Sequence, residues 1–358
     1  MSTLLAIGTR KGLFLATSDD RTSWQLSAAH FPMQAIYAVA IDTRAETPRL
    51  LAGADSNHWG PSVFHSDDLG ATWQEPEQAP VAFPDDTDGA LARVWQLQPG
   101  PADQPGTVWA GAEPASLFRS DDGGLSFELV RALWDHPHRP SWEPGAGGMC
   151  LHTIIPHGDR LVTAISAAGV YRSLDGGRTW NASNTGIEAR FFPDRYPEFG
   201  QCVHKIAADA EDPDRLYLQN HGGVYRSEDG GSSWNPIHAG LPADFGFAMV
   251  AHPRRGDSAF LYPLVSDEQR VPPDGASRVF ATTDGGNTWE ARAGGLPSEH
   301  VYGTVLRDAM CADDADPTGL YFGNRNGEVW ASADEGAHWQ SVATHLPDVL
   351  VVRAATLA

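Results

Sequence analysis

A Cys-x-His pair occurs twice in this chain of 358 residues, as Cys150 with His152 and as Cys202 with His204, 52 residues apart. Alternate residues of a strand point to the same side, so each cysteine should lie beside its histidine. The histidines could bind a ligand or transfer a proton, because an imidazole titrates near neutral pH. They could also hold zinc together with the cysteines or Asp308. A third interpretation is packing, with the cysteines acting as small apolar residues.

A second group of candidate residues consists of aromatic, imidazole and acidic side chains in segments rich in Pro and Gly. Its members are Trp59, Trp134, Asp135, His136, Trp142, Asp194 and Glu198. Aromatic faces beside carboxylates suit a polar ligand with apolar faces, such as a sugar ring. The alternative is that these aromatic rings pin long loops onto the fold.

A short repeated motif defines the elements that must position these side chains. Six of the 12 Trp close it, as in Ser173-Leu-Asp175-Gly-Gly177-Arg-Thr179-Trp180, and Phe127 takes the Trp position once. The closing aromatic residues stand at 24, 73, 127, 180, 234, 289 and 339, and a degenerate first copy has Asp19 in the Asp position. Asp accepts hydrogen bonds from turn amides and Gly adopts positive φ, so the motif predicts a tight turn between two strands. We call it the Ser-Asp turn. Calcium is the weaker alternative, because each copy lacks the 6–8 oxygen ligands that calcium prefers.

Four short strands per repeat, with no helical periodicity, predict the blades of a β-propeller. In the fifth unit the expected strands cover 202–208, 215–219, 223–227 and 233–236. The chain begins with three strands of a blade and ends with a spare strand at 349–355, which would complete that blade and remove two open edges. We therefore predict an all-β single domain over residues 1–358, a seven-bladed propeller with four antiparallel strands per blade.

The seven turns resemble the Asp-box (BNR) repeats of sialidase-like propellers, and the resemblance covers the whole chain. Related propellers include glycosidases, receptors and photosystem assembly factors. The resemblance therefore implies either a glycoside hydrolase-like enzyme or a non-catalytic scaffold that binds a protein or ligand. The Arg-Ile-Pro tripeptide that such sialidases usually carry near the N-terminus does not occur in this chain.

Strand direction alternates within a blade, which places the long connections on the rim opposite the Ser-Asp turns. These connections are 55–61, 74–90, 131–149, 181–201 and 266–277. Aligning the repeats brings Tyr37, Trp95 and Asp308 to the level of the two histidines, around the mouth of the central channel. Loops of this length in a compact fold are more often functional or disordered than idle.

Arginines are expected near the same mouth. Arg307 and Arg353 occupy matching inner-strand positions, and Arg10 lies in a loop on that rim. Arginines brought together in a channel need an anion or protein carboxylates between them. A carboxylate on a bound uronic or sialic acid, or pairing with Asp308 and other acids, would satisfy this need.

The catalytic candidates are His152, His204, Asp308 and Glu198. The ligand-binding candidates are Arg10, Tyr37, Trp59, Trp95, Trp134, Asp135, His136, Trp142, Asp194, Arg307 and Arg353. The alternative zinc ligands are Cys150, His152, Cys202 and His204, and no cofactor is expected otherwise.

Composition narrows the function classes. The net charge of −21 disfavours binding to nucleic acid or to anionic membranes. Three cysteines, an odd number, favour a reducing cytoplasmic setting, and the short apolar start lacks the features of a signal peptide. The expected partner is a small polar ligand, such as a carbohydrate, with a protein partner as the alternative.

Overall fold

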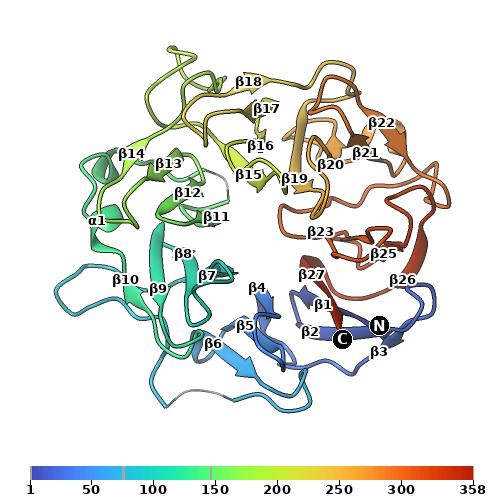
Figure 1. Ribbon diagram of the computed structural model, residues 1–358, viewed down its shortest axis with the longest axis horizontal. Helices are drawn as coiled ribbons and strands as arrows, with labels where there is room; N and C mark the ends of the chain where they lie inside the picture. The colour runs from blue at the N-terminus through green and yellow to red at the C-terminus, as the bar shows by residue number, and fades with distance from the viewer. Residues whose placement is uncertain (1, 75–76, 146, 358) are drawn as a thin grey trace.

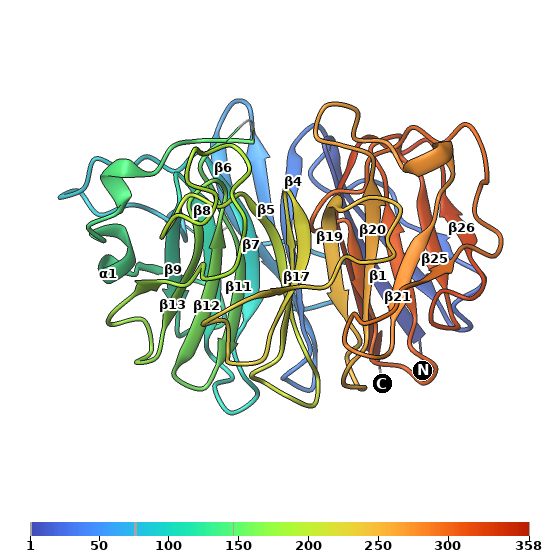
Figure 2. The ribbon, with the colours of Figure 1, turned by 90° about the horizontal axis from the view of Figure 1, so that it is seen from above.

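Seven antiparallel sheets form a ring around a central channel in the computed structural model, which describes residues 2–74, 77–145 and 147–357 (Figure 1). The predicted all-β, seven-bladed propeller is confirmed. Figure 2 shows the blades side by side around the ring, with loops projecting from both rims. We number the blades along the chain, beginning with the one that contains both chain ends.

The seven inner strands line the channel. They are β27 (Val349–Leu357), β4 (Ala35–Asp42), β7 (Arg93–Pro99), β11 (Leu151–His157), β15 (Val203–Ala208), β19 (Phe245–Ala251) and β23 (Met310–Ala312). The second strands are β1 (Ser2–Thr9), β5 (Arg49–Ser56), β8 (Val108–Glu113), β12 (Arg160–Ile165), β16 (Leu216–Asn220), β20 (Ala259–Leu264) and β24 (Leu320–Gly323).

The third strands carry the Ser-Asp turns at their ends. They are β2 (Gly12–Ser18), β6 (Gly60–Ser66), β9 (Ser116–Ser120), β13 (Gly169–Ser173), β17 (Gly223–Ser227), β21 (Val279–Thr282) and β25 (Val329–Ser332). The outer strands are short: β3 (Gln25–Leu26), β10 (Glu128–Leu129), β14 (Asn181–Ala182), β18 (Asn235–Pro236), β22 (Glu290–Arg292) and β26 (Gln340–Ala343). In the second blade a bridge between His65 and Gln74 stands at this outer position.

Helical structure is confined to short segments of the rim loops among the residues described. These are α1 (Arg131–Trp134) and two 3-10 turns, Arg139–Ser141 and Pro273–Gly275. The first two fall in the 131–149 connection, where the sequence predicted only loop. None of the described helices is long and apolar enough to cross a membrane.

The two chain ends share one blade, as predicted. Strand β27 pairs with β1 from Thr9–Val349 to Ser2–Leu357, so the sheet order is β27-β1-β2-β3. In Figure 1 the red C-terminal strand lies beside the blue N-terminal strand. This pairing closes the ring and removes two unpaired sheet edges.

The Ser-Asp turns have the predicted tight geometry. In the fourth blade Asp175 Oδ1 accepts hydrogen bonds from the amides of Arg178 and Thr179, and its Oδ2 accepts one from the Thr179 hydroxyl at 2.7 Å. Gly177 has φ of 90°, a conformation that L side chains rarely adopt. Both carboxylate oxygens are therefore bound by the turn's own donors, which supports a structural role.

The first turn differs from its predicted register by one residue. Asp20, and not Asp19, accepts the hydrogen bonds from Ser18 and from the amides of Thr22 and Ser23. Trp24 therefore follows the capping Asp20 by four residues. In the other turns the closing aromatic residue follows the aspartate by five, as Trp180 follows Asp175.

The hydrophobic core lies between neighbouring blades. One cluster joins Val162 and Ala164 of β12 to Ile206 of β15 and Leu218 of β16. The closing aromatic rings take part, since the indole of Trp234 packs in this cluster and donates to Ser183 O of the preceding blade at 2.9 Å. Apolar contact between blades fixes the ring and so fixes the shape of the channel mouth.

Candidate ligand pocket at the mouth of the channel

A β-bulge recurs at the same level of five adjacent inner strands. The pairing register shifts at Tyr37, Trp95, His152, His204 and Phe247. A bulge leaves one residue outside the ladder and re-aims its side chain. Tyr37, Trp95, His204 and Phe247 all line one cavity, so the bulges build part of its wall.

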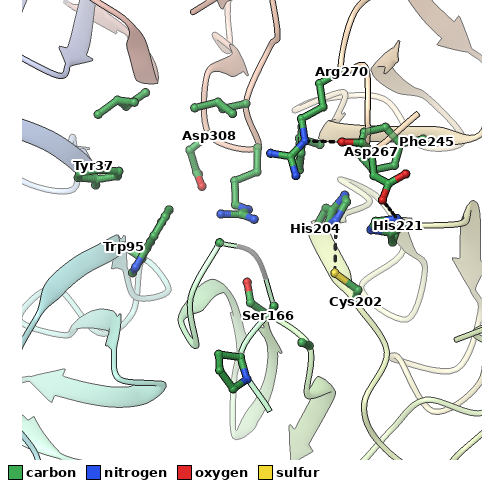
Figure 3. A pocket seen from close by; sticks show the side chains of 18 of the residues that line it. Tyr37, Trp95, Ser166, Cys202, His204, His221, Phe245, Asp267, Arg270 and Asp308 are labelled. Atoms are coloured by element: carbon green, nitrogen blue, oxygen red, sulfur yellow. Dashed lines mark hydrogen bonds and ion pairs between the residues drawn. The ribbon is translucent and has the colours of Figure 1, made fainter. Parts of the chain in front are cut away.

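The cavity lies at the mouth of the channel and has a volume of about 750 Å³ (Figure 3). Connections between blades and between second and third strands complete it, with Glu143, Phe191 and Phe192 from two long insertions and Asp267 and Arg270 from the loop after β20. Figure 3 shows Tyr37 and Trp95 on the opposite side of the pocket from Cys202, His204 and His221. The size suits a small ligand.

Seven of the predicted residues line this pocket. They are Arg10, Tyr37, Trp95, Cys202, His204, Arg307 and Asp308. The sequence alignment of the repeats thus placed inner-strand residues of several blades at one level.

His152 and Cys150 lie in the core and are not among the pocket-lining residues. His152 is fully buried, with Nε2 3.0 Å from Val203 O and Nδ1 3.1 Å from the Thr153 hydroxyl. Cys150 is also fully buried and its Sγ lies 3.2 Å from the Ser166 hydroxyl. Both nitrogens of His152 are therefore engaged by protein atoms, which leaves it no atom for the catalytic or zinc-ligand role considered above.

The aromatic residues of the 131–149 connection hold that loop on the blade. Trp134 is buried, and the Arg139 guanidinium lies 3.3 Å from its ring centroid. Trp142 donates from Nε1 to the Tyr171 hydroxyl at 2.8 Å, and the buried His136 ring packs edge-on against Tyr171. These contacts support the interpretation in which the rings pin the loop, and none of the three lines the pocket.

Four further candidates stand exposed outside the pocket lining. Trp59 is 85% exposed, and Asp135 and Asp194 are exposed on their loops. The Glu198 side chain is 73% exposed, with its carboxylate 3.8 Å from His138 Nε2. A solvent-exposed carboxylate beyond the pocket wall does not have the geometry of an acid or base acting on a ligand inside it.

Asp308 is buried at the pocket wall in an ion-paired cluster. Its Oδ1 accepts hydrogen bonds from Lys205 Nζ at 2.7 Å and from Arg353 Nη2. Burial alone would raise the pKa of the Asp308 carboxyl, but the charges of Lys205 and Arg353 outweigh it and hold the pKa well below its usual range. Asp308 is therefore a fixed carboxylate that pairs with Arg353. Arg353 was one of the predicted ligand-binding arginines, but it is not among the residues that line the pocket.

Two other arginines face the pocket without a carboxylate partner among the described residues. Arg307 lies between two aromatic faces, its Cζ 5.3 Å from the Trp95 ring centroid and 5.9 Å from that of Phe247. The Cζ of Arg270 lies 5.5 Å from the Phe247 ring centroid, and its Nε donates to the backbone oxygen of Asp267 at 2.8 Å. By contrast, Arg10 lies 3.6 Å from Asp348.

Cys202, His204 and His221 form a compact group at another part of the wall. One ligand atom from each lies within 4.8 Å of the other two. Burial, and next the charge of Arg307, set the pKa of His204 well below its usual value, while burial raises the pKa of the Cys202 thiol. A neutral imidazole of this kind is a poor general acid at neutral pH, which weighs against one of the two proton-transfer roles, acid or base, that the sequence suggested for His204.

Several pocket residues were missed by sequence analysis. Phe247 escaped because a bulge cannot be read from residue periodicity. Arg270, Asp267 and His221 follow strand ends in loops whose conformation the repeat does not fix, and Glu143 lies in an insertion confined to one blade. Lys205 was also missed. The sequence pattern selected Cys202 and His204, on one side of the strand, whereas the Lys205 side chain extends to Asp308.

Comparison with known proteins shows partial similarity to xyloglucanases. The chain is 23% identical over 257 residues to "Xyloglucanase Xgh74A" of Acetivibrio thermocellus, which covers 63% of this chain and 29% of that protein. It is 30% identical over 152 residues to a xyloglucanase of Paenibacillus sp, covering 42% and 13% respectively. The chain thus spans less than a third of the length of these relatives. No family model matches it.

Solved structures with a similar fold include an enzyme and a peptide complex. The Niastella koreensis GH74 enzyme has a TM-score of 0.61 at 16% identity, covering 94% of this chain and 54% of that one. The structure "YCF48 bound to D1 peptide" has a TM-score of 0.53 at 16% identity, covering 86% and 81%. At such identities the likeness concerns the propeller fold alone.

Proposed function

We propose that the pocket at the channel mouth binds a carbohydrate that carries a carboxylate group. The carbohydrate class is supported by the partial similarity to proteins named xyloglucanases. The acidic character is supported by Arg270 and Arg307, which line the pocket without a carboxylate partner among the residues described. The proposal rests above all on Arg307, held between Trp95 and Phe247.

Electrostatics favour an anion in this pocket. A guanidinium that faces a cavity offers planar, paired donors that match a carboxylate. Five arginines line the pocket, but three of them already have carboxylate partners: Arg10 and Arg325 lie beside Asp348, and Arg93 lies beside Asp55 and Glu113. Arg270 and Arg307 are the lining arginines without such a partner among the described residues, in a chain whose net charge is −21. A sugar carboxylate would supply the missing counter-charge.

Aromatic side chains line the pocket beside these charges, and a sugar ring would meet the part of their surface that Arg93, over Tyr37, and His204, stacked on Phe247, leave uncovered. Tyr37 and Trp95 lie with ring centroids 5.1 Å apart, and Trp95 is held by a hydrogen bond from Nε1 to Glu113 at 2.9 Å. Phe245 and Phe247 line the pocket with centroids 5.2 Å apart. Fixed apolar faces with a few charged groups between them are what a polar ring with apolar faces requires.

The proposal is tested by calorimetric titration with uronic-acid oligosaccharides and their carboxyl-reduced neutral counterparts. The two sets differ only in the charged group. We expect the acidic set to bind more tightly, with an affinity that falls as salt rises. Equal affinity for both sets would contradict the assignment of an acidic ligand, and Arg254→Gln, at an exposed arginine paired with Asp316, is the control for general surface charge.

Hydrolysis of the bound glycoside is the enzymatic form of this proposal. Asp308 is held by Lys205 and Arg353, so the pocket acids left for proton transfer are Glu143 and Asp267. Turnover of chromogenic uronides that is lost in Glu143→Gln and Asp267→Asn would support this form. Turnover that survives both substitutions would contradict it.

Binding without hydrolysis is the second candidate function. The observation that favours it is the ion-paired state of Asp308, the pocket carboxylate that is most buried. Tight binding of acidic oligosaccharides with no product after prolonged incubation would support this candidate.

A further inference from the structure

Cys202, His204 and His221 meet at the ends of two paired strands. Cys202 directly precedes β15, His204 occupies the bulge of β15, and His221 directly follows β16. The amide of His221 donates to Cys202 O at 2.9 Å, which brings the two strand ends into register. Figure 3 shows the three side chains together at the pocket wall.

The separation of the sulfur and nitrogen atoms matches that of two ligands of one metal ion. Cys202 Sγ lies 3.6 Å from His204 Nε2. With a Zn–S bond of about 2.3 Å and a Zn–N bond of about 2.0 Å, a tetrahedral angle gives an S···N separation of about 3.5 Å. One ligand atom of His221 lies within 4.8 Å of both. The Cys202–His204 separation is therefore that of two ligands of one tetrahedral ion, and His221 lies within reach as a third after a small movement of its side chain.

A hydrogen bond orients the His204 ring, and a carboxylate lies beside the His221 ring. His204 Nδ1 lies 2.5 Å from Gly246 O, and because a carbonyl only accepts, Nδ1 carries the proton and Nε2 presents its lone pair to Cys202. His221 Nε2 lies 3.4 Å from Asp267 Oδ2. Ligating histidines usually hold one nitrogen on a carbonyl or carboxylate in this way, which fixes the ring and raises its basicity as a ligand.

We propose that Cys202, His204 and His221 bind a zinc ion whose fourth position opens into the pocket. Three protein ligands with an open position are the pattern of catalytic rather than structural zinc sites. Binding would release the thiol proton of Cys202, and the thiolate together with the Asp267 carboxylate would offset the two charges of the ion. The site goes beyond the proposed function, because it does not depend on the ligand being a carbohydrate.

The sequence-equivalent pair on the preceding blade lacks these features. Cys150 Sγ contacts the Ser166 hydroxyl, and both nitrogens of His152 contact protein atoms. The zinc ligands considered from the sequence are therefore divided: Cys202 and His204 have a third donor in His221, whereas Cys150 and His152 have none in this group. This makes Cys150 a matched control for Cys202.

Cobalt titration of the chelator-treated full chain tests the proposal without reference to activity. Co²⁺ replaces zinc and reports its ligands by a thiolate-to-cobalt charge-transfer band and by the intense visible bands of a tetrahedral ion. We expect one equivalent to produce both signals and added zinc to remove them. Cys202→Ser should abolish the charge-transfer band, Asp267→Asn should weaken affinity about 10–100-fold, and Cys150→Ser should change neither.

Wild-type protein gives a second measurement that does not depend on the folding of any variant. X-ray absorption of the zinc-loaded chain should show one sulfur at about 2.3 Å and nitrogen ligands at about 2.0–2.1 Å. An absence of saturable cobalt binding, a charge-transfer band that survives Cys202→Ser, or a zinc shell without sulfur would overturn the proposal. Failure of carbohydrate binding would not, so the two proposals fail separately.

Discussion

His152 and His204 make the same hydrogen bond to the next blade, but through opposite ring nitrogens. His152 donates from Nε2 to Val203 O on β15, and His204 donates from Nδ1 to Gly246 O on β19. The tautomer of His152 thus leaves Nδ1 for the Thr153 hydroxyl, while that of His204 leaves Nε2 for Cys202 at the pocket. One repeated sequence pattern therefore yields a buried inter-blade tie in one blade and a pocket-lining side chain in the next.

The tie made by His152 predicts a loss of stability without a loss of ligand binding. His152→Ala would leave Val203 O buried without its donor, at a cost of about 1–3 kcal/mol in the free energy of unfolding, in addition to that of the cavity. Urea denaturation measures this cost. His152→Gln is the control, since its amide nitrogen takes the position of the imidazole Nε2 and keeps a donor there, and a His152→Ala variant as stable as the wild type would contradict the assignment.

The Asp308 cluster predicts a larger effect. Asp308→Asn would leave the partly exposed Lys205 and Arg353 without their shared counter-charge. Breaking a fully buried ion pair in this way costs about 3–5 kcal/mol, which sets the upper limit of the expected loss. The double variant Asp308→Asn with Lys205→Met removes one of the stranded charges, so it should recover part of the loss. Denaturation of the three proteins measures the difference, and a single variant that loses less than about 1 kcal/mol would argue against the cluster as described.

Substitution of Trp134 should lower the stability of the fold and substitution of Trp59 should not, and neither should change the affinity for the ligand. Trp134→Ala removes a buried ring stacked against Arg139 and should cost about 3–5 kcal/mol. Trp59→Ala removes an exposed ring and should change stability by less than about 0.5 kcal/mol. Neither residue lines the pocket, so a fall in oligosaccharide affinity with either well-folded variant would show that the ligand reaches beyond it.

Acid stability should depend on the Ser-Asp turns. The Thr179 hydroxyl and amide lower the pKa of Asp175 to about 2, and the corresponding groups of Thr72 lower the pKa of Asp68 to about 2. An unfolded Asp titrates near 3.9, so the ionised form favours the folded state. This contribution is fully present above about pH 4 and is lost as the pH falls through about 2. The urea midpoint should therefore fall steeply across this window.

Substitution of one turn carboxylate tests the origin of that slope. Asp175→Asn should lower the midpoint at neutral pH and make its fall on acidification shallower, because one group with a depressed pKa is gone. Asp103→Asn, at an exposed carboxylate outside the turns, should leave the profile unchanged. An Asp175→Asn profile that runs parallel to that of the wild type would contradict the explanation.

The blade count and ring closure could be predicted because both follow from spacing. Closing aromatic residues such as Trp180 and Trp234 recur at a nearly constant interval, and each interval holds one sheet. The spare C-terminal strand then has one place to pair. These features depend on local turn chemistry and on chain length, which the sequence displays directly.

The pocket was only partly predictable because its shape depends on irregular backbone. Trp95 and His204 were found by alignment of the inner strands. The bulge of β19 that places Phe247 at the pocket, and the bulge of β11 at the buried His152, leave no periodic signal in the sequence. The roles of Arg307 and Arg353 also could not be separated from the sequence. Arg353 pairs with Asp308, whereas Arg307 lies beside the Trp95 ring.

In the proposed function, Arg307, an arginine of the channel pocket without a carboxylate partner among the described residues, recognises a sugar carboxylate. The most direct measurement is a calorimetric cycle that combines wild-type and Arg307→Gln protein with a uronic-acid oligosaccharide and its carboxyl-reduced counterpart. A charge-assisted hydrogen bond is worth about 1.5–3 kcal/mol, so the substitution should weaken the acidic ligand about 10- to 150-fold and leave the neutral one nearly unchanged. Equal losses for both ligands, or none for either, would contradict the claim.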